Sequence, residues 1–148
     1  MAGSLNRLAL TATLHCLTGC AIGEVLGMVI ATALGWNDVA SIATAVVLAF
    51  CFGYSFTLLP LVRSGLGLRR SLGTAFAADT VSITIMEIVD NAFIVVVPGA
   101  LTAELADALF WWSLLLGLFL AFWAAFPVNR WLIARGRGHA AAHAHHAH

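Results

Sequence analysis

The chain has 148 residues, of which 61% are hydrophobic and only 9% are charged. A soluble domain normally has about 25% charged residues, so this composition excludes that class. The formal net charge is zero, so nothing indicates a nucleic-acid partner. The sequence also has no P-loop, dinucleotide-binding or serine-nucleophile motif, so nothing suggests a soluble hydrolase or a dinucleotide site. We therefore expect a membrane protein.

Apolar runs of spanning length occur four times, at about 8–34, 39–61, 73–97 and 108–132. Because the bilayer core has no water to satisfy backbone polar groups, such runs cross it as helices. The sequence therefore predicts an all-α integral membrane four-helix bundle. Its transmembrane domain covers residues 1–138, and a histidine-rich cytoplasmic tail covers residues 139–148.

Charge is distributed unevenly between the two ends of these runs. The basic residues precede the first run, separate the second and third, or follow the fourth: Arg7, Arg63, Arg69, Arg70, Arg130, Arg135 and Arg137. The other two loops contain Asp38, Glu104 and Asp107 and no basic residue. By the positive-inside rule, both termini are predicted to be cytoplasmic, in a bacterial inner membrane.

The first run contains side chains that can bind metals: His15, Cys16, Cys20, Glu24 and Met28. Cys16, Cys20 and Glu24 recur every four residues, so they share one helix face. The segment up to Cys20 also resembles a lipoprotein signal peptide, but the apolar run continues beyond it, which disfavours cleavage. We therefore expect a spanning helix with a polar face.

Small residues follow the same four-residue spacing in this run, at Gly19, Gly23, Gly27, Ala31 and Gly35. Such a ladder predicts close packing against another helix. In the second run, Pro60 is expected to end or bend the helix. The fourth run has no ionisable residue within its apolar part and is predicted to be a packing or lipid-facing helix.

The third run carries Asp79, Met86, Glu87 and Asp90 on one broad face. An ionisable residue at membrane depth costs about 2.5–3.5 kcal/mol on insertion scales. Three carboxylates in one span therefore indicate either an ion or proton site or a hydrogen-bonded helix seam.

A weak internal repeat relates the first two runs to the last two, with Glu24 aligned to Glu87. Two spans per unit make the repeats parallel, so the first and third runs should have the same direction. The two glutamates are then expected at matching depth, near the middle of the membrane.

These side chains together suit a transition-metal ion. Thiol, thioether and imidazole groups suit copper(I) and zinc, and carboxylates offset the charge of the ion. We expect transport or binding of a metal, with copper first and zinc next. The tail would capture the ion through His139, His143, His145, His146 and His148, unless these histidines belong to an engineered tag.

Other functions compete with metal handling. Cys16, Cys20 and Cys51 could serve a thiol–disulfide redox protein, although a Cys-x-x-x-Cys spacing is not the usual redox motif. Glu24, Glu87 and Asp90 could relay protons or cations through a channel. A haem site with His15 as axial ligand is a weaker alternative.

Three segments resemble a bacterial family of small four-span membrane proteins that is catalogued as a domain of unknown function. They are His15–Glu24, Thr84–Asn91 and Phe126–Trp131. The resemblance covers roughly residues 12–137 and implies the four-span membrane fold, but no activity. The expected partners are the lipid bilayer, a metal ion and further copies of the chain in a homo-oligomer, whose interface could join the polar faces.

Overall fold

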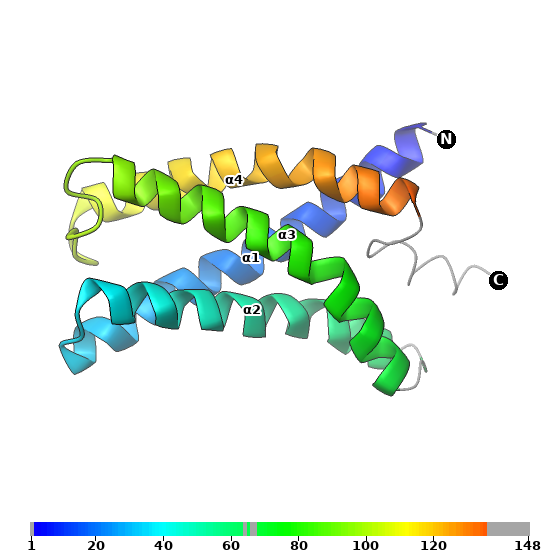
Figure 1. Cartoon of the computed structure of the whole chain (residues 1–148), viewed down its shortest axis with the longest axis horizontal. Helices are drawn as coiled ribbons and strands as arrows, with labels where there is room; N and C mark the ends of the chain where they lie inside the picture. Colours follow the sequence, from blue (N-terminus) through cyan, green and yellow to red (C-terminus); the bar gives the residue numbers. More distant parts are fainter. Residues whose placement is uncertain (1, 64, 66–67, 136–148) are drawn as a thin grey trace.

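The structure is a computed structural model that describes residues 2–63, 65 and 68–135. Its helices are, in chain order, α1 (Ala2–Leu34), α2 (Asp38–Arg63), α3 (Leu68–Val96) and α4 (Ala108–Ala134) (Figure 1). No strand occurs in this described part. The predicted all-α four-helix fold is confirmed, and the helix bounds lie close to those of the apolar runs.

The helices α1 and α3 cross at the centre of the molecule, with α2 and α4 on either side (Figure 1). The α1–α2 and α3–α4 loops lie together at one end, and the end of α2 and the start of α3 lie at the opposite end with the start of α1. This up-and-down order gives α1 and α3 the same direction, as predicted.

Length and hydropathy identify three helices that are able to cross a membrane, within Gly3–Leu34, Asp38–Leu59 and Ala108–Ala134 of the described residues. Large apolar side chains such as Trp112 and Phe119 are exposed on the outside of the bundle. These features indicate a membrane protein whose outer surface suits lipid. The helix α3, which carries the carboxylates, is not among the three, so its crossing of the membrane stays a prediction.

Gly19, Gly23 and Gly27 of the predicted ladder pack against α2, which confirms the predicted close approach, whereas Gly35 lies after the end of α1 and a Cβ there would meet nothing within 4 Å. A Cβ added to Gly19 would lie 2.8 Å from the Gly53 Cα atom, and one added to Gly27 would lie 2.6 Å from the Ala45 Cα atom. Gly23 faces the backbone of Ala49 in the same way. Real Cβ atoms do not come this close to backbone, so the two helices can touch only because these side chains are missing.

The helix ends follow simple local rules, with one exception. Gly35 ends α1 with a φ angle of 65°, and Gly99 turns the chain after α3 with a φ angle of 81°, in the left-handed region that glycine tolerates. Pro60, however, does not end α2, which continues to Arg63. Pro127 likewise lies inside α4. In a membrane, such prolines are tolerated where neighbouring groups satisfy the freed backbone carbonyls.

Candidate functional site

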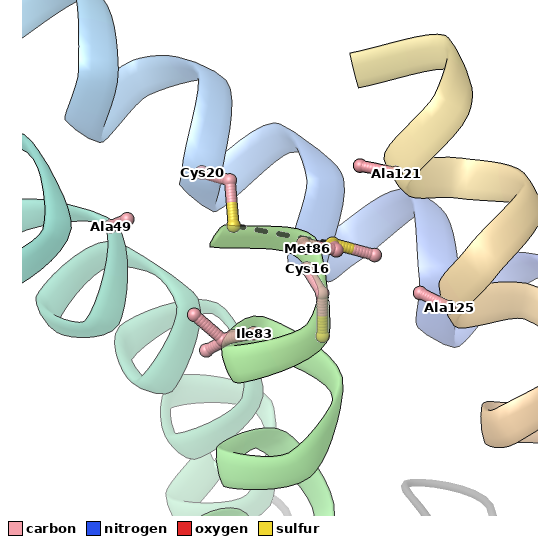
Figure 2. Close-up of a cluster of buried hydrophobic side chains, with 7 residues drawn as sticks. All are labelled: Cys16, Cys20, Ala49, Ile83, Met86, Ala121 and Ala125. Carbon is pink, nitrogen blue, oxygen red and sulfur yellow. Dashed lines mark hydrogen bonds between the residues drawn. The ribbon is translucent and has the colours of Figure 1, made fainter. Parts of the chain in front are cut away.

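Two sulfur-bearing side chains meet in the core of the bundle. The Cys20 thiol of α1 donates a weak hydrogen bond to the Met86 Sδ atom of α3 at a distance of 4.0 Å (Figure 2). Ala121 and Ala125 of α4 and Ile83 of α3 belong to the same buried cluster. The small alanines leave room for the methionine between the helices, so the two sulfur atoms lie together in a water-excluded space.

The Glu87 carboxyl lies beside this sulfur pair. It is close enough to the Cys20 thiol for the two groups to interact. Its Oε2 atom accepts a hydrogen bond of 3.2 Å from the Asn91 side chain, whose amide also donates to the Glu87 backbone carbonyl at 2.8 Å. The Oε1 atom is buried and has no hydrogen-bond partner among the described residues. One oxygen of Glu87 is therefore held by Asn91, and the other is available to a ligand.

A pair of carboxyls lies one helical turn farther along, where Glu24 of α1 and Asp90 of α3 are neighbours. Glu24 is 8% exposed and Asp90 is 1% exposed. Apart from their contact with each other, the oxygen atoms of these two carboxyls have no hydrogen-bond partner among the described residues. Asp90 also lies directly against Gly117 of α4, where a Cβ atom would collide with its Oδ1 atom. A glycine in α4 thus provides the space for a buried acid in α3.

On the other side of the sulfur pair, the polar contacts continue. The Cys16 thiol donates to the Asp79 Oδ1 atom at 3.6 Å and lies beside Ser82. The Asn129 side chain of α4 donates to Ser82 Oγ at 3.0 Å and to Thr13 Oγ1 at 2.9 Å. These groups are buried. They tie α1, α3 and α4 together near the end of the bundle where α1 starts.

These contacts form one continuous feature, which we call the polar column. From the loop end to the opposite end, its members are Glu24, Asp90, Glu87, Cys20, Met86, Cys16, Asp79, Ser82, Thr13 and Asn129. The members from α1 and α3 pair in the same order along the two helices, since Cys16 contacts Asp79 and Cys20 contacts Met86. Two like-directed helices therefore place acidic and sulfur groups along a shared interior.

A cavity of about 280 Å³ lies at the loop end of the polar column. We call it the vestibule, and its polar lining includes Glu24, Met28, Asp38, Asn91 and Glu104. Phe110 and Leu114 of α4 supply part of an apolar wall. Asp38 and Glu104 are exposed at this end, whereas Glu24 is buried. The polar column therefore begins at the inner surface of a cavity of substantial volume.

The polar column is acidic around Glu24, Glu87 and Asp90, and the arginines whose side chains are described lie outside it. Arg7, Arg63, Arg69, Arg130 and Arg135 are exposed. Carboxylates buried without a base must bind a proton or another cation, because an isolated negative charge is costly in a medium of low dielectric. The arrangement can thus hold or pass cations.

Within the part of the chain that is described, no group of three or more His, Cys, Asp and Glu residues has the geometry to hold a metal ion. The column instead offers successive pairs, such as Cys20 with Met86 and Cys16 with Asp79. Such pairs differ from a closed structural metal centre, in which four protein ligands surround the ion.

The predicted site residues are brought together only in part. Seven join the column: Cys16, Cys20, Glu24, Asp79, Met86, Glu87 and Asp90. Met28 lines the vestibule. His15 is exposed on the outside of α1 and does not face the column. Residues 139–148, with the five tail histidines, lie outside the described residues.

The cysteines of the redox alternative are also separated. Cys16 and Cys20 are buried one turn apart in α1, and Cys51 is exposed on α2. All three are free thiols. Exchange needs an accessible thiolate, so the burial of the α1 pair does not favour that chemistry.

Three members of the column, Ser82, Thr13 and Asn129, were not among the predicted site residues. Asn129 was placed in a helix expected to pack or to face lipid, and Thr13 was not assigned any role. The signal for Asn129 is its spacing, because Gly117, Ala121, Ala125 and Asn129 recur every four residues and form the buried seam of α4. An amide at the end of a small-residue seam indicates a buried hydrogen-bonding group.

The chain belongs to the family described as "Domain of unknown function (DUF4396)", whose model matches residues 6–138. The match covers all four helices from Asn6 onward and therefore the whole polar column. No curated protein and no solved structure matches the chain.

Proposed function

We propose that this protein moves a soft metal cation, copper(I) first, across a membrane along the polar column. The observation that carries the proposal is the contact between Cys20 and Met86, a thiol and a thioether buried side by side among carboxyls. Thiolate and thioether are the ligands that select copper(I). Neighbouring carboxylates would offset the charge of the ion and lower its desolvation penalty in the bilayer.

The alternation of ligands supports movement rather than storage. A cation that passes from Glu24 to the sulfur pair and then to Cys16 and Asp79 always finds a new partner in the next turn of the same two helices. Conduction needs sites that bind well enough to admit an ion and weakly enough to release it. Successive pairs meet that need better than a closed four-ligand site, so copper(I) ranks above zinc, which prefers four ligands.

The proposal includes a topology. We propose that α3 crosses the membrane with the other three helices, because its carboxyls point into the bundle and not toward lipid. Its length of 29 residues is sufficient. The arginines then favour cytoplasmic termini in a bacterial inner membrane, and the vestibule would open on the opposite side. A homo-oligomer and metal capture by the tail histidines remain further parts of this proposal.

The test is uptake of copper(I), or of Ag⁺ as a redox-inert substitute, into proteoliposomes. Cys20→Ser and Met86→Leu should each reduce the uptake rate by tenfold or more, whereas Cys51→Ser, which alters an exposed thiol outside the column, should not change it. Met86→Leu is the sharper variant because it removes the sulfur atom with little change in volume. Uptake that is indifferent to both column variants would refute the proposal.

A second function is favoured by a separate observation, the facing carboxyls of Glu24 and Asp90. Two adjacent acids in a low-dielectric interior readily share and transfer a proton. The column would then be a proton path with Glu87 as the next relay group. Proton flux into metal-free proteoliposomes, abolished by Glu24→Gln and unaffected by Met86→Leu, would identify this function in place of copper transport.

A further inference from the structure

The vestibule combines a hollow, an acidic lining and a buried acid without a hydrogen-bond donor. Glu24 is more than nine-tenths buried and lines the cavity, and apart from the neighbouring Asp90 carboxyl it has no hydrogen-bond partner among the described residues. Carboxylates normally have such partners when they are buried. The lack of a donor at this position indicates that the Glu24 carboxyl binds a proton or another cation.

We propose that the vestibule is the loading site at which a partly hydrated cation enters the polar column, with Glu24 as its first buried ligand. This inference rests on the proposed function, in that the column carries cations, but it does not depend on the cation being copper. The inference specifies at which end of the bundle the cation enters and which residues select it.

The lining suits stepwise dehydration. Asp38 and Glu104 are exposed acids toward the open end, so a hydrated cation meets negative charge before any buried group. Asn91 uses its amide nitrogen on Glu87, which leaves its carbonyl oxygen for a ligand. Met28 adds a thioether at intermediate depth. A cation that moves inward thus exchanges water for carboxylate, amide and thioether groups.

Charge selectivity follows from this lining. No arginine or histidine lines the cavity among the residues that are described. A cleft lined by charge of one sign and walled by apolar side chains concentrates ions of opposite sign and raises their arrival rate by about 10–10³-fold. The vestibule should therefore accept cations and exclude anions of the same size.

Cysteine accessibility tests the site without any metal. In a Cys51→Ser background reconstituted in vesicles, Met28→Cys would present a thiol in the vestibule. The matched control is Leu26→Cys, two residues away on the exposed outer face of α1. Each is treated with a cationic trimethylammonium and an anionic sulfonate methanethiosulfonate reagent, both membrane-impermeant. Modification is followed by mass spectrometry, and rates are normalised to those of a free thiol in solution.

We expect Met28→Cys to react at least about tenfold faster with the cationic reagent than with the anionic one. Adding Asp38→Asn and Glu104→Gln, which neutralise the exposed acids of the lining, should reduce this ratio, and Leu26→Cys should stay unmodified because it faces lipid. The parent with only Cys16 and Cys20 reports correct folding, since these buried thiols react only if the bundle opens.

Two results would overturn the inference. Met28→Cys that is as unreactive as Leu26→Cys would mean that the cavity is closed to water, and equal normalised rates for the two reagents would mean that it does not select cations. The labelling uses no copper, so it can succeed in a protein that fails the copper uptake test. In that case the vestibule would stand as a cation-selective site, and only the assignment of copper as the ion would be wrong.

Discussion

Replacing Gly117 by alanine would probe the position of Asp90 in the polar column. A Cβ atom at position 117 would collide with the Asp90 Oδ1 atom and would lie 3.0 Å from its Cγ atom. The Phe93 Cδ1 atom, at 3.4 Å, would remain in ordinary contact. Asp90 is buried against α4, so its carboxyl would have to rotate away from its present position beside Glu24.

The expected free-energy changes can be worked from two opposing terms. Overpacking a core costs about 1–3 kcal/mol, whereas alanine is favoured over glycine in a helix by about 1 kcal/mol. Gly117→Ala should therefore destabilise the protein by about 0–2 kcal/mol, from these two terms. In an Asp90→Ala background the collision disappears, and the same change should stabilise by about 1 kcal/mol. The coupling energy between the two positions is thus expected to be about 1–3 kcal/mol.

The assay is a double-mutant cycle by equilibrium unfolding in mixed micelles, combined with cation flux into proteoliposomes. Gly3→Ala is the control, because a Cβ there meets nothing within 4 Å and should not couple to position 90. Flux should fall in Gly117→Ala even though no ionisable group has been removed. If the two substitutions at 117 and 90 are additive within about 0.5 kcal/mol, the carboxyl does not occupy the space left by the glycine.

Three further predictions follow from the packing. Gly23→Ala should lower the free energy of unfolding by about 3 kcal/mol or more, because the added methyl group would meet the backbone of α2 and the two helices would have to separate. Equilibrium unfolding in mixed micelles would measure this change. By the same assay, Asn129→Ala should lower the free energy of unfolding by about 1–2 kcal/mol, because it removes two buried hydrogen bonds. The control Asn6→Ala removes one exposed hydrogen bond and should lower it by less than about 0.5 kcal/mol. N-ethylmaleimide should leave the buried Cys16 and Cys20 unlabelled in the folded protein and should label all three thiols after denaturation, as counted by intact mass. Fast labelling of the two buried thiols in the folded protein would contradict the placement of α1.

The helices themselves could be predicted closely from the sequence. Uninterrupted apolar runs cannot lie in a bilayer as anything but helices, and Gly35 and Pro98-Gly99 mark where the first and third must end. The glycine spacing of α1 also predicted a close neighbour correctly. These features depend on residues near one another in the chain, so the sequence contains the necessary information directly.

The register between α1 and α3 was harder to predict. Alignment of the repeat placed Glu24 level with Glu87, and in the structure Glu24 also lies beside Asp90, one turn farther along α3. The periodicity of a single helix fixes which face is polar, whereas the shift and crossing angle between two helices depend on how their side chains interlock. The vestibule was not predicted for the same reason, because it is formed by five separate segments that include the α3–α4 loop.

The acidity of the interior also constrains the function. Three carboxyls, those of Glu24, Glu87 and Asp90, are buried together in the core. At about 2.5–3.5 kcal/mol each on insertion scales, they oppose membrane folding by an energy of the order of 10 kcal/mol, which is comparable to the whole stability of a typical domain. A packing seam would be more stable with alanine or leucine at these positions. Because the penalty falls when a proton or metal ion neutralises the acids, a cation is the partner that makes such a core physically reasonable, and the sulfur pair within it favours a soft one.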